Sequence, residues 1–290
     1  MKKIFIFALM FVALSVQGAT KVETQHFELA DSVRFYEPDD PQSDGYKFSE
    51  MVKADWPITI NGKKSLALND FLLEEVFYAC QNPNCFPGNV NDVNTLTGCV
   101  KNWIDYILHS SAMANEYIVK DYGTPGVKDI TFEEDPMRCM YELTDLKQSH
   151  VVGDLVFFVE YSEIYYGGVH PDYMYNYYAF DAALDRPIRL DDIITDRSKL
   201  LRILPKYDKR DKDVKWWDNI NAVDLGNFYI KDGNMVCPFA PYAVGPFCDG
   251  EIEVKVPLKT LNAKGLLTTY GKKFLKNNTG NKGKKAKKRK

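Results

Sequence analysis

The sequence predicts an α+β fold, with an antiparallel sheet packed with a few helices, in a two-part chain whose C-terminal half is β-rich. Aromatic residues make up 13% of the 290 residues, including 18 tyrosines and 17 phenylalanines, and aromatic side chains are typical of strands. Several long segments alternate polar and apolar residues, which indicates strands with one buried face. Strands and helices do not alternate as the βαβ units of a parallel sheet would require.

The N-terminal part, residues 20–145, is expected to be an α/β piece with two long strands and two helices. Residues 21–36 and 46–60 alternate polar and apolar side chains and predict strands. Residues 66–81 carry apolar side chains at helical spacing, with Asn69 or Asp70 near the expected cap. A second helix is expected within residues 95–121.

The C-terminal part, residues 146–276, is expected to hold most of the remaining strands. Strands are predicted at 153–166 and 174–182, and a helix capped by Thr195 or Asp196 is predicted at 195–204. Within residues 226–258, Asp232-Gly233 is the type of pair that closes a β-hairpin. The charged run at 208–213 is expected to be solvated.

The first 19 residues are typical of a secretory signal peptide. Lys2 and Lys3 precede an apolar stretch at 4–16, and Gly18 and Ala19 are small residues that suit cleavage. The apolar stretch is shorter than the roughly 20 residues that a membrane-spanning helix needs. The sequence therefore predicts an exported protein, periplasmic or secreted, with no transmembrane anchor.

The six cysteines all lie after this segment, and an even number in an oxidising compartment suggests disulfides. Proximity favours a Cys237–Cys248 disulfide and a pair within Cys80, Cys85 and Cys99, although Cys139 leaves other pairings open. No metal site is expected, since Cys80 and Cys85 have no matching second pair and no histidine nearby.

Charge is unevenly distributed along the chain. The formal net charge is −3, but residues 276–290 hold eight Lys or Arg and no acid. Setting aside these eight positive charges and those of Lys2 and Lys3 leaves the body at −13. Residues 277–290 are expected to be a disordered basic tail, either solubilising or adhering to an anionic surface. Such an acidic body makes nucleic acid an unsuitable partner.

The most distinctive stretch is an aromatic loop between two predicted strands, expected to bind a ligand rather than to catalyse. Three prolines, Pro238, Pro241 and Pro246, stiffen it. Its candidate binding residues are Phe239, Pro241, Tyr242 and Phe247.

A glycine turn is the second candidate site. Gly167 and Gly168 allow a tight turn before His170, and Asp172 follows two positions later. A histidine near a carboxylate can act as a base or bind a ligand, or its imidazole can simply form a hydrogen bond across the turn. The chain contains no phosphate-binding loop, nucleophile elbow or His-Glu-x-x-His motif, and no cofactor is predicted. Tyrosines at 165–166 and 173–178 and tryptophans at 216–217 would line a sugar-binding face or pair across strands in the core.

Three motifs in order resemble those of an exported bacterial domain of unknown function, known from the lysozyme-sensing anti-sigma factor RsiV and from beside the catalytic domain of the peptidoglycan deacetylase PdaC. They are Gly167-Gly168-x-His170, then Leu190-Asp191-Asp192, then Pro241-Tyr242 with Gly245, and the resemblance covers about residues 151–261. It implies an α+β fold, an envelope location and contact with cell-wall glycan or a lysozyme-like protein. The chain shows neither a transmembrane helix nor a deacetylase domain, so neither family activity carries over.

The leading hypothesis is an exported bacterial envelope protein that binds cell-wall glycan or a lysozyme-like protein without catalysis. One alternative is an envelope glycan or peptide hydrolase that uses His170 and Asp172 as acid and base. The other is a structural or assembly protein in which the basic tail is the working part.

Overall fold

The computed structural model describes residues 20–36, 46–77, 93–110, 118–122, 139–210, 217, 220–221 and 225–275. The predicted signal peptide, the basic tail, Cys80 and Cys85 lie outside this described part. The chain forms two compact units. Unit 1 comprises residues 1–150 and 156–187, and unit 2 comprises residues 151–155 and 188–290.

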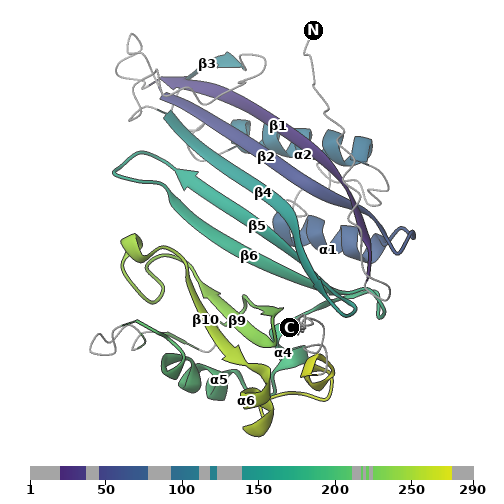
Figure 1. Ribbon diagram of the computed structural model, residues 1–290. Helices are drawn as coiled ribbons and strands as arrows, with labels where there is room; N and C mark the ends of the chain where they lie inside the picture. Colours follow the sequence, from purple (N-terminus) through teal and green to yellow (C-terminus); the bar gives the residue numbers. More distant parts are fainter. Residues whose placement is uncertain are drawn as a thin grey trace, which may run out of the picture. The chain divides into compact units, whose positions relative to one another are not determined.

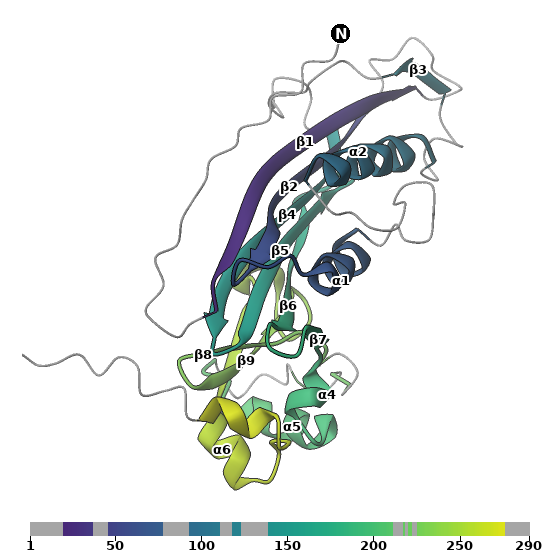
Figure 2. The same cartoon turned by 90° about the vertical axis from the view of Figure 1, so that its right-hand side faces the viewer.

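Unit 1 is built on a seven-stranded sheet with two helices on one face (Figures 1 and 2). The strand order is β3 (Ile118–Tyr122), β1 (Val22–Tyr36), β2 (Tyr46–Ile60), β4 (Cys139–Val152), β5 (Leu155–Tyr165), β6 (Asp172–Asp181) and β7 (Arg186–Ile188). The helices are α1 (Leu66–Val76) and α2 (Val93–Ser110). The α+β class is confirmed. The sheet is mixed, however, because β1 pairs with β2 antiparallel whereas β2 pairs with β4 parallel.

Strand β2 has the predicted bounds, and its alternating pattern sets the core of unit 1. Phe48, Val52, Ala54 and Trp56 are all buried on one face, and Glu50 lies in the same row with no exposed surface. Helix α1 begins where predicted, but its cap is not Asn69 or Asp70. Ser65 is the N-cap, and its hydroxyl accepts a hydrogen bond of 3.1 Å from the Leu68 amide.

The unit boundary differs from the one expected at residue 145. Strand β4 passes through that position and pairs with β2 from Lys47–Cys139 to Ala54–Leu146. This ladder joins the start of the predicted C-terminal part to the N-terminal sheet, and the compact unit ends at residue 187. A parallel pair of strands needs a long crossover, which here contains α1 and α2.

Unit 2 contains a three-stranded antiparallel sheet and short helices. The sheet order is β10 (Ile252–Pro257), β9 (Asn234–Phe239) and β8 (Tyr229–Lys231). The helical segments are α4 (Leu190–Ile193), α5 (Arg197–Ile203), η3 (Leu204–Lys206), η5 (Phe247–Asp249), α6 (Leu258–Ala263) and η6 (Gly271–Leu275). The predicted hairpin turn at Asp232-Gly233 is confirmed, since both residues have positive φ, 48° and 74°.

The acids of the Leu-Asp-Asp motif act at helix ends, not in a site of their own. The Arg189 amide donates a hydrogen bond of 2.8 Å to the Asp192 carboxylate at the start of α4. Asp191 accepts two hydrogen bonds from Arg197, at 2.7 and 3.0 Å. Asp196 caps α5 as predicted, accepting from the Lys199 amide at 2.8 Å. Among the described helices, none is long and apolar enough to cross a membrane.

Candidate binding loop

The aromatic loop leaves β9 at Phe239 and returns to the sheet at β10. Its path is set by two tight turns, in which the Ala243 amide donates to the Ala240 carbonyl at 3.1 Å and the Gly250 amide donates to the Phe247 carbonyl at 2.9 Å. Val244 is 1% exposed and anchors the middle of the loop in the core of unit 2. The loop is therefore an ordered part of the unit, with a buried anchor at its centre.

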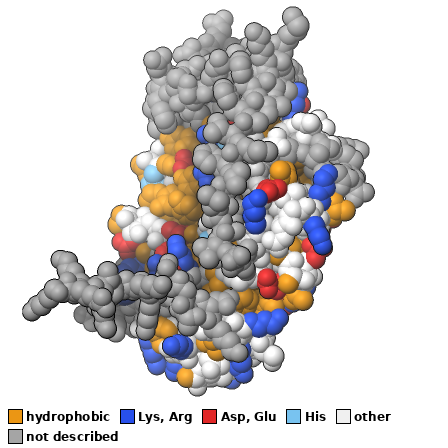
Figure 3. Space-filling view, turned by 45° about the vertical axis from the view of Figure 1, so that its right-hand side comes forward, with side chains coloured by type: hydrophobic (Ala, Val, Ile, Leu, Met, Phe, Trp, Pro, Cys, Tyr) orange, Lys and Arg blue, Asp and Glu red, His pale blue; other side chains and the backbone are white. Residues whose placement is uncertain are grey.

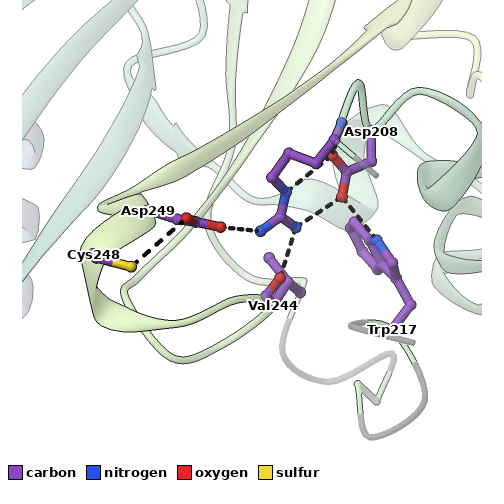
Figure 4. A network of polar contacts seen from close by, with 6 residues as sticks. Asp208, Trp217, Val244, Cys248 and Asp249 are labelled. Atoms are coloured by element: carbon purple, nitrogen blue, oxygen red, sulfur yellow. Dashed lines mark hydrogen bonds and ion pairs between the residues drawn. The ribbon is translucent and has the colours of Figure 1, made fainter. Parts of the chain in front are cut away.

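Arg210 holds the loop through hydrogen bonds to Val244 and Asp249, and it is held in turn by Asp208; Figure 4 labels these three partners. Its guanidinium donates to the Val244 carbonyl at 2.6 Å and to the Asp249 carboxylate at 3.2 Å. On its other side it donates to both oxygens of Asp208, at 3.1 and 2.8 Å. One planar cation thus joins both sides of the loop to the segment that follows η3, as the fork of a guanidinium allows.

Asp208 is the fixed end of this network. Its side chain is only 9% exposed, and it also accepts a hydrogen bond of 3.0 Å from the indole of Trp217. The Trp217 ring packs edge-on against Phe239 at the base of the loop, with 5.2 Å between centroids. Hydrogen bonds from Arg210 lower the pKa of the Asp208 carboxyl below its usual range, so both partners stay charged at neutral pH. The interpretation of this charged run as solvated is wrong for Asp208 and Arg210.

Gly245 gives the guanidinium its space. A Cβ placed on Gly245 would lie 2.4 Å from Nη1 of Arg210 and 3.2 Å from a carboxylate oxygen of Asp249. Real side chains do not approach so closely, so a side chain at 245 would displace the guanidinium from its observed position.

Tyr242 is the most unusual residue of the loop. It has φ of 68°, a left-handed conformation that is a genuine outlier for a bulky residue. Its side chain is 62% exposed, and its ring lies 5.6 Å from that of Phe247. Strained conformations of this kind cost on the order of 1–3 kcal/mol and are concentrated at functional sites. The loop therefore presents a pair of neighbouring aromatic rings on a rigid support.

A carboxyl group with a raised pKa, that of Glu251, lies where the loop meets β10. Burial, with a smaller contribution from Glu253, raises the pKa of Glu251 to about 7. Its Oε2 is buried and has no hydrogen-bond partner within the described structure. Glu253 differs, because Tyr229 and Lys255 both bind its carboxylate. Glu251 was not singled out in the sequence, where nothing local distinguishes it from Glu253.

The glycine turn is a separate feature of unit 1. Gly167 and Gly168 have φ of 92° and 120°, as a tight turn requires. The hydroxyl of Tyr165 donates to the Gly168 carbonyl at 2.9 Å. Nδ1 of His170 lies 3.0 Å from the carbonyl oxygen of Pro171, a contact that uses Nδ1 as the donor. Asp172 is exposed. This geometry orients the imidazole within its own turn.

The predicted binding residues therefore fall into two groups. Gly167, Gly168, His170 and Asp172 belong to unit 1, whereas the loop residues belong to unit 2. Within the loop, Phe239 is buried at the base, and Tyr242 and Phe247 make the ring pair. Among the described residues, no group of three or more His, Cys, Asp or Glu is placed to hold a metal ion.

The predicted Cys237–Cys248 disulfide is not formed in the structure, and both thiols are free. Cys237 lies in the middle of β9, paired with Val254 of β10, and is buried. Cys248 lies in η5 and is exposed, with its sulfur 4.0 Å from the Asp249 carboxylate. The sequence places the cysteines at the two ends of the loop, but one faces the core and the other faces solvent. Arg210 and Asp208 close the loop instead.

Comparison with known proteins confirms the resemblance found in the sequence. Residues 189–259 match a family model described as "Protein of unknown function (DUF3298)". That segment includes the Leu-Asp-Asp and Pro-Tyr motifs, Arg210 and Glu251, and it excludes the Gly167–His170 turn. No curated protein matches the chain.

Two solved structures share the fold. A member of the DUF3298 family from Bacteroides fragilis has a TM-score of 0.59 at 14% identity, covering 90% of this chain and 99% of its own. A DUF3298 family protein from Pseudomonas aeruginosa PAO1 has a TM-score of 0.50 at 13% identity, covering 85% and 95%. This chain is thus an α+β protein in which residues 189–259 are similar to the DUF3298 domain.

Proposed function

We propose that the chain is an exported bacterial envelope protein that binds cell-wall glycan or a lysozyme-like protein through the loop Phe239–Phe247, without catalysis. The observation that supports this most is the conformation of Tyr242. Tyr242 is 62% exposed, has a left-handed backbone conformation and lies beside the ring of Phe247, and such strained conformations are concentrated at functional sites. Tyrosine rings stack on the apolar faces of sugars and also anchor protein interfaces.

The loop is held in one conformation, which favours the binding of one ligand over the binding of many different shapes. Arg210 and the buried Val244 hold the loop before any ligand arrives, so little conformational entropy is lost on binding. The acidic body, at −13 before the tail, favours a basic protein over an acidic one by electrostatic attraction.

A co-sedimentation experiment with insoluble peptidoglycan and a pull-down with immobilised lysozyme test the proposal on the full mature chain. We expect binding to one of the two, and loss of that binding in Tyr242→Ala. Leu184→Ala is the matched control, since Leu184 is 49% exposed and lies in unit 1, away from the loop in sequence. Absence of binding to both materials would contradict the proposal.

A further inference from the structure

Five tyrosines and one glutamate form a cluster on the sheet of unit 1, which we call the tyrosine platform. They come from the three neighbouring strands β4, β5 and β6. The members are Tyr141, Tyr161, Tyr165, Tyr173, Tyr175 and Glu163, and each is partly exposed. The binding loop does not include any of them.

Strand alternation places the platform on the face opposite α1 and α2. The hydroxyl of Tyr178 in β6 donates to the Glu75 carbonyl of α1 at 3.4 Å, so even-numbered residues of β6 face the helices. Tyr173 and Tyr175 therefore face the other way. Figure 2 shows both helices on one side of the sheet. On the face that Figure 3 draws, hydrophobic side chains gather in patches among scattered charged side chains.

The rings of the platform are in mutual contact. Tyr161 lies 5.0 Å from Tyr175 and 6.1 Å from Tyr173, measured between ring centroids. Tyr141 lies 5.8 Å from Tyr165. These contacts across strands hold the rings in fixed positions, which makes the surface preorganised.

Glu163 puts a negative charge among these rings. Its two oxygens accept hydrogen bonds from the hydroxyls of Tyr141 and Tyr161. Within the described structure it forms no ion pair with Lys or Arg. Lys53 of β2 pairs with Glu28 at 3.2 Å, and Lys147 of β4 pairs with Asp145.

The two hydroxyl donors also strengthen the negative potential of their rings. Burial and the hydrogen bonds to Glu163 raise the pKa of Tyr141 and Tyr161 above the usual value, so both remain phenols that donate. A phenol that donates to a carboxylate is polarised toward its ring, and a ring richer in electrons attracts a cation more strongly.

We infer that the tyrosine platform binds a cationic side chain, lysine or arginine, presented by a basic partner polypeptide. The rings would contact the cation through their faces and Glu163 would supply the countercharge, the combination by which aromatic sites recognise organic cations. The acidic body would steer such a partner toward the chain. This surface belongs to unit 1 and does not depend on the function proposed for the loop.

Titration calorimetry at low ionic strength with a hexa-arginine peptide tests the inference. The matched ligand is hexacitrulline, which has nearly the same shape but no charge. We expect measurable binding of hexa-arginine only, and about fivefold weaker binding in Glu163→Gln. The glutamine keeps the shape of the side chain, and its amide oxygen can accept from one tyrosine hydroxyl while its NH2 group donates to the other.

Controls separate the platform from general attraction to an acidic protein. Glu74→Gln removes the same charge from an exposed position on α1, and we expect it to retain the wild-type affinity. Tyr161→Leu removes one ring and should also weaken binding about fivefold. Equal losses in Glu74→Gln and Glu163→Gln would overturn the inference. Equal binding of the two peptides would also overturn it. So would a neutral glycan oligomer that binds more tightly than hexa-arginine and whose affinity is the same for Glu163→Gln and the wild-type chain.

Discussion

The contact between Gly245 and Arg210 predicts a specific thermodynamic coupling. In Gly245→Ala, the new Cβ would lie 2.4 Å from Nη1 of Arg210 in the native geometry. This contact forces the guanidinium to move. It cannot move without disturbing the hydrogen bonds from its Nη2 to Asp208 and to the Val244 carbonyl. We expect the substitution to break the 3.2 Å hydrogen bond to Asp249 and to loosen the bond to Val244.

The expected size of this effect follows from those bonds. A hydrogen bond to a charged group contributes about 1.5–3 kcal/mol when it is well buried. The side chains of Arg210 and Asp249 are 21% and 34% exposed, so solvent replaces part of the lost interaction. We therefore expect Gly245→Ala to lower the free energy of unfolding by about 1–2 kcal/mol.

A double-mutant cycle with Arg210→Ala measures whether the arginine causes the loss. Urea unfolding followed by circular dichroism and tryptophan fluorescence gives the free energies. Without the guanidinium the nearest neighbour of the new methyl group is the Asp249 carboxylate oxygen at 3.2 Å, on an exposed side chain that can turn away. Gly245→Ala should then cost less than about 0.5 kcal/mol. Gly226→Ala serves as the control, since its Cβ would meet nothing within 4 Å. An equal cost of Gly245→Ala in both backgrounds would refute the assigned role of Gly245.

Three further predictions concern other parts of the chain. Burial, with a smaller contribution from Glu142, raises the pKa of Glu50 well above its unfolded value of 4.5. The folded state therefore binds the proton more tightly than the unfolded chain does, so stability should fall as pH rises above 4.5. Glu50→Gln should flatten that slope in unfolding experiments, and an unchanged slope would count against it. Native maleimide labelling followed by peptide mass mapping should modify Cys248 and spare Cys237, whose pKa burial raises to about 12; equal labelling would contradict this. Gly271→Ala would place a Cβ 2.5 Å from the main-chain oxygen of Ile193 in α4. It should lower the free energy of unfolding by about 2–3 kcal/mol, seen as a lower thermal unfolding midpoint, whereas the Gly226→Ala control should not.

Features that depend on neighbouring residues were predictable from the sequence. The turn at Asp232-Gly233, the bounds of β2 and the cap of α5 at Asp196 each follow from a few adjacent side chains. The alternation of polar and apolar residues, the backbone freedom of glycine and the capping hydrogen bonds of short polar side chains decide such features, and all three can be recognised in the sequence.

Features that depend on distant residues were not predictable. The parallel pairing of β2 with β4 joins segments about 90 residues apart, and no local pattern signals it. The same holds for Arg210, which lies 34 residues before the Val244 carbonyl that it binds. In a run of charges it resembles any solvated arginine, although the small residue at 245 is a signal that something bulky approaches the loop.

The disulfide prediction failed for a related reason. Spacing along the chain made Cys237 and Cys248 neighbours, whereas a disulfide also requires the two side chains to point toward each other. Cys237 is directed into the core by its position in β9, and Cys248 is exposed in a helical turn. The direction of a side chain at the edge of an irregular loop is set by the folded loop, not by sequence spacing.

The affinity of Tyr242 variants for peptidoglycan and for lysozyme tests the proposed function most directly. Tyr242→Asn removes the ring while keeping a residue that tolerates the left-handed conformation, and Tyr242→Phe keeps the ring. We expect Tyr242→Asn to weaken binding about 30-fold, for whichever of the two materials the wild-type chain binds, as at an aromatic hot spot. The unfolding midpoint of Tyr242→Asn should be unchanged. Tyr242→Phe should bind nearly as well as the wild-type chain. Equal affinity of Tyr242→Asn and wild type would contradict the role of the loop.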